Sequence, residues 1–191
     1  MLPTTQFAFR KGLGTCDELL CVSHILQSAL ESEQEAMIVQ IDFTAAFNRV
    51  NHQGILYRLN SVGIGGSVFS VLTQFLSNRS QFVLVDGCRS KLVDVVSGVP
   101  QGSVLCPLLF LLYTSELFSI LENKLIGYAD YSTLMAVAPS PGTRVTVAES
   151  LNHDLVRVNV WCDLWGIKLN ASKTKTMKVS RSRTMHTSHP N

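Results

Sequence analysis

Residues 124–137 read KLIGYADYSTLMAV and contain two runs with strand character, 124–128 and 132–137. Only Ala129, Asp130 and Tyr131 separate them. Two short apolar runs joined by so few residues are typical of an antiparallel hairpin. The stretch therefore predicts a hairpin with Asp130 at or beside its tip.

A second apolar run also ends at an acid. Residues 36–41, AMIVQI, read as a buried strand that delivers Asp42 at its end. A carboxylate beside a buried strand is costly to desolvate unless something compensates it, and a bound cation is the usual compensation. Side by side, the two strands would form a divalent metal site from Asp42 and Asp130. The residues alone leave the alternative open that each Asp merely caps a turn or helix.

The rest of the chain mixes helices and hairpins. A capping-box pair, Thr15 and Glu18, introduces a helix over 16–31. Asp86-Gly87 between 81–85 and 91–96 is a strong hairpin signal. Further helices are predicted over 44–61, 67–76 and 103–121. Another helix follows the loop at 139–142 and stops at Gly166, and an edge strand is predicted over 173–179. Because strands and helices do not alternate strictly, the predicted fold class is α+β.

The composition indicates one globular domain. The chain has 191 residues, of which 46% are hydrophobic and 16% charged. No run approaches the roughly 18 apolar residues of a membrane span, and no secretion signal opens the chain, so we expect neither membrane insertion nor secretion. Five scattered cysteines, an odd number without zinc-type spacing, favour a reduced, intracellular protein.

Charge is unevenly distributed. Of the 16 basic and 14 acidic residues, six basic residues and no acid lie from Lys168 onward, which leaves ten basic and 14 acidic residues before it. A basic C-terminal stretch suits a polyanionic partner, whereas a merely solvated tail is an equally open reading. Residues 181–191 are expected to be a disordered tail.

Five short motifs occur in order along nearly the whole chain. They are QFAFRKG at 6–12, DFTAAF at 42–47, SGVPQGS at 97–103, YAD at 128–130, and GIKLN at 166–170 with Lys173-Thr174. Together they resemble the reverse transcriptase domain of LINE-like (non-LTR) retrotransposons. The resemblance implies a polymerase-type palm with an antiparallel sheet and packed helices, plus part of the fingers, without a thumb. It divides the chain into a reverse transcriptase domain over 1–180, with partial fingers over 1–35 and palm over 36–180.

The resemblance also implies roles for individual residues. Asp42 and Asp130 would hold Mg²⁺, with Mn²⁺ as a possible substitute. Lys173 would lie near the leaving pyrophosphate and complete the catalytic set. Phe43 and Phe47 would lie against the nucleotide, with the Phe47 ring occupying the space of a ribose 2′-hydroxyl. An aromatic residue at that position would equally suit a core.

Other motif residues would contact substrates. Pro100, Gln101 and Gly102 would form a loop against the incoming nucleotide and template, although the tripeptide also suits a plain turn before a helix. Arg10, Lys11 and Arg79 would contact nucleic acid, with a surface role as the alternative. The implied partners are an RNA template, a DNA primer and deoxynucleoside triphosphates, and the implied location is the nucleus or cytoplasm.

The chain departs from the family pattern at the metal site. Tyr131 stands where the family has a second Asp, and a neutral phenol cannot replace an anionic ligand. Asn48, Cys106 and Ala8 replace the usual Asp, Gly and Gly. The function expected from the sequence is therefore RNA-directed DNA polymerisation by two-metal nucleotidyl transfer, impaired by Tyr131. The alternatives are a non-catalytic nucleic-acid-binding remnant and a pseudogene product.

Overall fold

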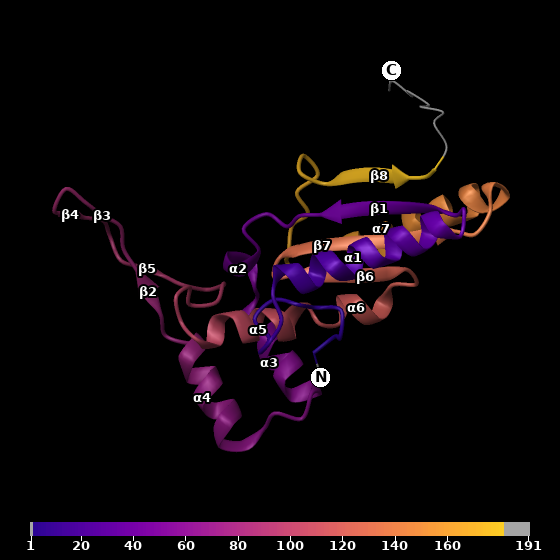
Figure 1. Cartoon of the computed structure of the whole chain (residues 1–191). Coiled ribbons are helices and arrows are strands. Elements are labelled where there is room, and N and C mark those ends of the chain that lie inside the picture. The colour runs from indigo at the N-terminus through magenta and orange to yellow at the C-terminus, as the bar shows by residue number, and fades with distance from the viewer. Residues whose placement is uncertain (1, 182–191) are drawn as a thin grey trace.

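The centre of the molecule is an antiparallel sheet of four strands in the order β6-β7-β1-β8 (Figure 1). The computed structural model describes residues 2–181. The strands are β1 (Glu35–Ile41), β6 (Lys124–Tyr128), β7 (Tyr131–Ala138) and β8 (Lys175–Val179). The predicted hairpin around Asp130 and the predicted edge strand are both confirmed, and with them the α+β class.

Helices cover both faces of this sheet. On one face Ile38, Ile126 and Met135 pack against α1 (Thr15–Glu31). On the other face Val39 and Leu134 belong to a larger core, which includes residues of α7 (Arg144–Trp165). Successive strand side chains point to opposite faces, so a sheet covered on both sides needs nearly continuous apolar strands. This is why residues 36–41 and 132–137 lack a clean apolar–polar alternation.

The single helix predicted over 44–61 is wrong in one respect, because two helices occupy this range. They are α2 (Ala46–Arg49) and α3 (His52–Ser61). Val50 ends α2 with a non-helical backbone, Asn51 is extended, and the Asn51 side chain accepts a hydrogen bond from the Gly54 N–H at 3.0 Å. An asparagine that caps a new helix in this way ends the preceding one.

The long helix predicted over 103–121 is likewise divided, into α5 (Leu105–Thr114) and α6 (Leu117–Ile120). At the break, the Thr114 hydroxyl donates to the Phe110 carbonyl at 3.1 Å and the Ser115 hydroxyl to the Leu112 carbonyl at 2.8 Å. Hydroxyl groups that bond to the preceding turn bend or interrupt a helix.

Residues 80–96 form a narrow arm that projects from the body beyond α4 (Gly66–Leu76) (Figure 1). At its base β2 (Ser80–Gln81) pairs with β5 (Val93–Asp94), and near its tip β3 (Leu84–Val85) pairs with β4 (Cys88–Arg89). Asp86 and Gly87 both have positive φ, as a two-residue hairpin turn of type I′ requires. The hairpin predicted here is confirmed, although its strands are shorter than expected.

A 3-10 turn, Pro141–Thr143, precedes α7. All five cysteines are free thiols; Cys106 and Cys162 lie in the core, whereas Cys16 and Cys88 are exposed. Within residues 2–181, none of the helices is long and apolar enough to cross a membrane. The expected tail lies almost wholly outside the described residues.

Candidate active site

The two acidic residues predicted to bind metal lie at the same end of the sheet. In the antiparallel register Ile41 is opposite Ser132, and Gly127 is opposite Ser132 on the other side. Asp42 follows Ile41 directly, and Asp130 precedes Ser132 by two residues, in the β6–β7 loop. Continuing the β1–β7 register by one residue places Tyr131 beside Asp42.

Asp42 is buried and faces a lysine. Asp42 is 7% exposed. Its Oδ2 lies 3.8 Å from Nζ of Lys173, whose side chain is 65% exposed. The Asn170 N–H donates to the Asp42 carbonyl at 2.9 Å, and the Thr44 N–H donates to the Lys168 carbonyl at 2.7 Å. These backbone bonds hold residues 168–174 against residues 42–44, which explains why the last motif of the chain lies beside the first acidic one.

Asp42 opens into a cavity of about 560 Å³. Tyr131 and Lys173 also line it, together with Gln40 of β1 and Glu18 and Leu19 of α1. Ile38 and Gln40 of β1 line this cavity from one face of the strand, and Ile41 and Asp42 line it at the strand's end. The cavity is therefore lined by the acids Asp42 and Glu18, the lysines Lys173 and Lys175, and Tyr131.

Asp130 is placed differently. It is half-buried at the tip of the β6–β7 hairpin and is not among the residues that line the Asp42 cavity. Tyr131, by contrast, lines that cavity with a side chain that is 60% exposed. Among residues 2–181 no group of three His, Cys, Asp or Glu side chains is arranged to hold a metal ion. The position next to Asp42 is thus occupied by Tyr131, where the sequence resemblance implies a second Asp.

The two predicted aromatic contacts with a nucleotide occupy different settings. Phe43 is 5% exposed and forms an antiparallel bridge with Leu169, so its ring belongs to the core. Phe47 is half-buried, and its ring lies 4.2 Å from that of Phe110, centroid to centroid. Because the Phe47 ring packs against Phe110, it is fixed in place and can act as a steric barrier.

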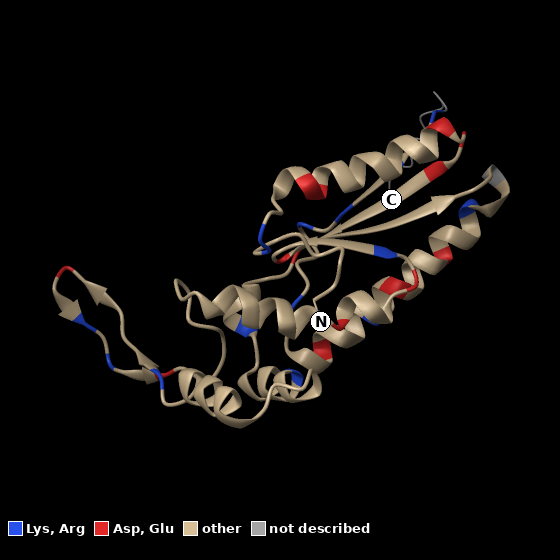
Figure 2. Cartoon of the chain, turned by 60° about the horizontal axis from the view of Figure 1, so that its bottom comes forward, with Lys and Arg blue, Asp and Glu red and all other residues tan. Residues whose placement is uncertain are grey.

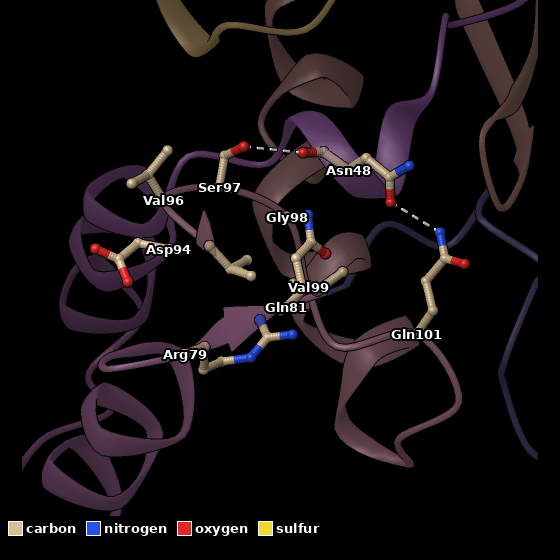
Figure 3. A pocket seen from close by; sticks show the side chains of 10 residues that line it. Asn48, Arg79, Gln81, Asp94, Val96, Ser97, Gly98, Val99 and Gln101 are labelled. Carbon is tan, nitrogen blue, oxygen red and sulfur yellow. Dashed lines mark hydrogen bonds between the residues drawn. The ribbon is translucent and has the colours of Figure 1, made fainter. Parts of the chain in front are cut away.

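The loop with Pro100, Gln101 and Gly102 packs against α2. The Val99 N–H donates to the Phe47 carbonyl at 3.0 Å, and the Gln101 side-chain amide donates to Oδ1 of Asn48 at 2.9 Å (Figure 3). Gly98 has φ of 82°, and a Cβ there would lie 2.9 Å from the Asn48 carbonyl oxygen. Glycine is therefore required for the loop to approach α2 so closely.

The same loop borders a second cavity, of about 470 Å³. Arg79 and Asp94, from the base of the projecting arm, line it opposite Asn48 and Gln101 (Figure 3). Nη1 of Arg79 is buried without a hydrogen-bond partner within the described part of the chain. A guanidinium so close to the loop is well placed to meet an anionic group.

The two other predicted nucleic-acid contacts differ from each other. Lys11 is exposed. Arg10 has a structural role, because its Nη1 donates to the carbonyls of Pro3 at 2.9 Å and of Gln6 at 3.1 Å. Its role as a nucleic-acid contact stays a prediction, and at least one guanidinium nitrogen is already committed to the N-terminal loop.

Sequence reasoning gave no role to Gln6, which the structure places against the Asp130 loop. Gln6 is 1% exposed, and its side chain hydrogen-bonds to Ala129, 123 positions away. A polar residue that opens a motif is a weak signal, and only the fold reveals its partner.

Comparisons with known proteins agree with this architecture. Residues 1–186 match the family model described as reverse transcriptase (RNA-dependent DNA polymerase). Among curated proteins, the chain is 32% identical over 179 residues to the RNA-directed DNA polymerase from mobile element jockey of Drosophila funebris. It is 31% identical over 180 residues to the probable RNA-directed DNA polymerase from transposon BS of Drosophila melanogaster. These alignments cover 90% and 91% of this chain but 19% and 20% of those proteins.

The solved structures point to the same fold. Apo telomerase from Candida tropicalis, truncated from its C-terminal domain, aligns with a TM-score of 0.64 over 89% of this chain and 36% of that chain, at 14% identity. Telomerase from Candida albicans, in complex with a fragment of telomeric RNA, aligns with a TM-score of 0.64 over 95% of this chain. Since the family model matches almost every residue and the antiparallel sheet with its ordered motifs is present, this chain belongs to the reverse transcriptase (RNA-dependent DNA polymerase) family.

Proposed function

We propose that this chain is the catalytic core of an RNA-directed DNA polymerase in which the metal site is weakened by Tyr131. The observation that carries the proposal is the row formed by Tyr131, Asp42 and Lys173 at one end of the sheet, inside one cavity. The substrates would be an RNA template, a DNA primer and deoxynucleoside triphosphates. In this proposal residues 1–35 belong to the fingers and residues 36–180 to the palm.

The residues present fit Mg²⁺, although with fewer anionic ligands than the family pattern has. Mg²⁺ is bound in nucleotide enzymes by one or two carboxylates together with substrate phosphates. The Asp42 carboxylate is buried, and its nearest cation is 3.8 Å away, so it has room for a closer ligand. Asp42, and Asp130 from the adjoining β6–β7 loop outside the lining of the Asp42 cavity, would hold the metal, which would activate the primer hydroxyl and neutralise the leaving pyrophosphate.

The side chains around the metal ligands would neutralise charge, select deoxynucleotides and position the nucleotide. Lys173 is exposed on the open side of Asp42, where its ammonium group can neutralise charge on a leaving phosphate or donate a proton. The Phe47 ring, fixed against Phe110, would exclude a ribose 2′-hydroxyl. Gln101, held by Asn48, would present the loop to the incoming nucleotide and template.

Primer extension on an RNA template tests the proposal. We expect the wild-type chain to extend a DNA primer weakly with Mg²⁺ and deoxynucleotides, and Asp42→Ala to abolish that extension. Asp163→Ala, which changes an exposed acid on α7, is the matched control and should extend like the wild type. Equal extension by wild type and Asp42→Ala would contradict the role of Asp42.

A specific observation supports the alternative of a non-catalytic nucleic-acid-binding chain. Most of the chain in Figure 2 carries neither Lys or Arg nor Asp or Glu, whereas residues 168–178 contain four lysines and no acid. Within the described residues, Lys178 pairs with Glu35 at 3.7 Å, whereas Lys168 and Lys175 form no ion pair. The unpaired lysines are the ones free to bind phosphate.

Salt dependence of RNA binding tests this alternative. Affinity for single-stranded RNA is expected to fall steeply with added salt, because each bound phosphate releases counterions. Lys175→Gln should reduce the slope of log affinity against log salt by about 0.7. Lys178→Gln, the control whose ammonium is already paired, should reduce it less. A wild-type affinity that does not respond to salt would rule out phosphate binding by this region.

A further inference from the structure

The side chain of Gln6 is a buried amide that binds one residue of the hairpin loop twice. Its Oε1 accepts from the Ala129 N–H at 3.2 Å, and its Nε2 donates to the Ala129 carbonyl at 3.4 Å. Oε1 also accepts from the Ala8 N–H at 3.1 Å. Gln6 is 1% exposed, so its side-chain amide has no access to water, whereas Ala129 is half-buried.

Ala129 needs such support because of its backbone. Its φ is 57°, a left-handed conformation that costs a residue with a Cβ and usually calls for glycine. Ala129 and Asp130 are the two loop residues between paired Tyr128 and Tyr131, so the conformation of Ala129 sets where Asp130 points. The amide of Gln6 satisfies both polar backbone groups of Ala129 in the strained geometry.

The backbone around Gln6 is fixed to the same hairpin. The Phe7 N–H donates to the Gly127 carbonyl and the Gly127 N–H donates to the Thr5 carbonyl, both at 2.9 Å. A Cβ on Gly127 would lie 2.8 Å from Nε2 of Gln6 and 2.7 Å from the Phe118 ring. Arg10 in turn donates to the Gln6 carbonyl at 3.1 Å. Residues 5–10 therefore form a brace on the outer edge of β6.

We propose that Gln6 is a positioning residue, which holds the Ala129-Asp130 loop so that the Asp130 carboxylate is presented for metal binding. This inference rests on the proposed function for the role of Asp130, but the contact between Gln6 and the loop can be tested without any catalysis. Arg10 supports it by donating from Nη1 to the Gln6 carbonyl.

The first measurement is amide hydrogen exchange by NMR in Gln6→Met, which keeps the side-chain length and removes both polar groups. The Ala129 amide is expected to exchange about tenfold faster, the size of effect that follows from losing hydrogen bonds to a buried partner. Gln27→Met, at an exposed position of α1, is the control and should leave this amide unchanged. Should Gln6→Met not fold, Gln6→Asn keeps an amide on a shorter side chain that cannot reach Ala129.

The second measurement is a Mn²⁺ titration of the same samples, followed by paramagnetic broadening of the amides at 129–132. With Gln6→Met the Mn²⁺ concentration at half-broadening is expected to rise about tenfold, within the range seen when support of a metal ligand is lost. An unchanged Ala129 exchange rate, or equal acceleration across the whole sheet, would overturn the brace. Faster exchange with an unchanged Mn²⁺ midpoint would overturn the positioning role.

These outcomes are separate from those of the proposed function. If no variant extends a primer, polymerisation is refuted while the exchange and Mn²⁺ data still decide the role of Gln6. If extension occurs and the Mn²⁺ midpoint is insensitive to Gln6, the polymerase proposal stands and this inference fails.

Discussion

Replacing Tyr131 with aspartate is expected to raise primer extension on an RNA template by about 100-fold or more, the effect typical of one charged group in a preorganised catalytic site. Tyr131 lies in the register position next to Asp42 and lines the same cavity. A carboxylate there adds one negative charge where divalent ions must be held. The measurement is the initial rate of deoxynucleotide incorporation as a function of Mg²⁺ concentration.

The matched control for this gain is Tyr131→Asn, which removes the ring and matches aspartate in size without its charge. We expect it to extend no better than the wild type. If Tyr131→Asn gains as much as Tyr131→Asp, the tyrosine ring was an obstacle and the missing charge was not the defect. Adding Asp42→Asn to Tyr131→Asp should return extension to background, since the new carboxylate cannot work without its neighbour.

Asp154→Ala is expected to lower the free energy of unfolding by about 3–5 kcal/mol, as when one partner of a buried charged network is removed. Asp154 lies in α7 and is fully buried. Its carboxylate accepts from the backbone N–H groups of Glu122 and Asn123 at 3.0 and 2.8 Å, and from Arg157 at 2.9 Å. Without it, the donors that join α7 to the turn before β6 lose their partner.

Chemical denaturation measures this loss, and Asp163→Ala on the same helix is the control because Asp163 is exposed. The control should change stability by less than about 0.5 kcal/mol, as is usual for surface substitutions. A loss of less than about 1 kcal/mol in Asp154→Ala would show that the network contributes little.

The same residue predicts a dependence of stability on pH. Burial by itself would raise the pKa of Asp154, but the hydrogen bonds from Glu122, Asn123 and Arg157 together hold this pKa below its ordinary value of 3.8. A carboxyl group whose pKa is lower in the folded state stabilises the fold above its unfolded pKa, and this stability is lost as pH falls through the folded pKa. The stability difference between wild type and Asp154→Ala should therefore shrink below about pH 4. A difference that stays constant down to pH 2 would contradict the lowered pKa.

The sequence predicted the parts of the fold that depend on local chemistry. The runs at 36–41, 124–128 and 132–137 are apolar enough to be strands wherever they are placed, and Asp86-Gly87 has the one backbone preference that a tight hairpin turn needs. It failed where two local preferences compete. At Asn51 and at Thr114-Ser115, side chains that bond to nearby backbone interrupt helices that apolar periodicity alone would continue.

The candidate site likewise combines features that the sequence predicted with features that only the tertiary structure decided. The identities of Asp42, Lys173 and Tyr131, and the absence of a second acid after Asp130, follow from the order of residues in the chain. That Tyr131 and Lys173 flank Asp42 follows from strand register, because a shift of one residue would turn each side chain to the other face. That Arg10 binds the N-terminal loop, and that Gln6 holds Ala129 from 123 positions away, depends on contacts between segments that no local pattern encodes. Local sequence set which groups were available, and long-range pairing set which of them meet.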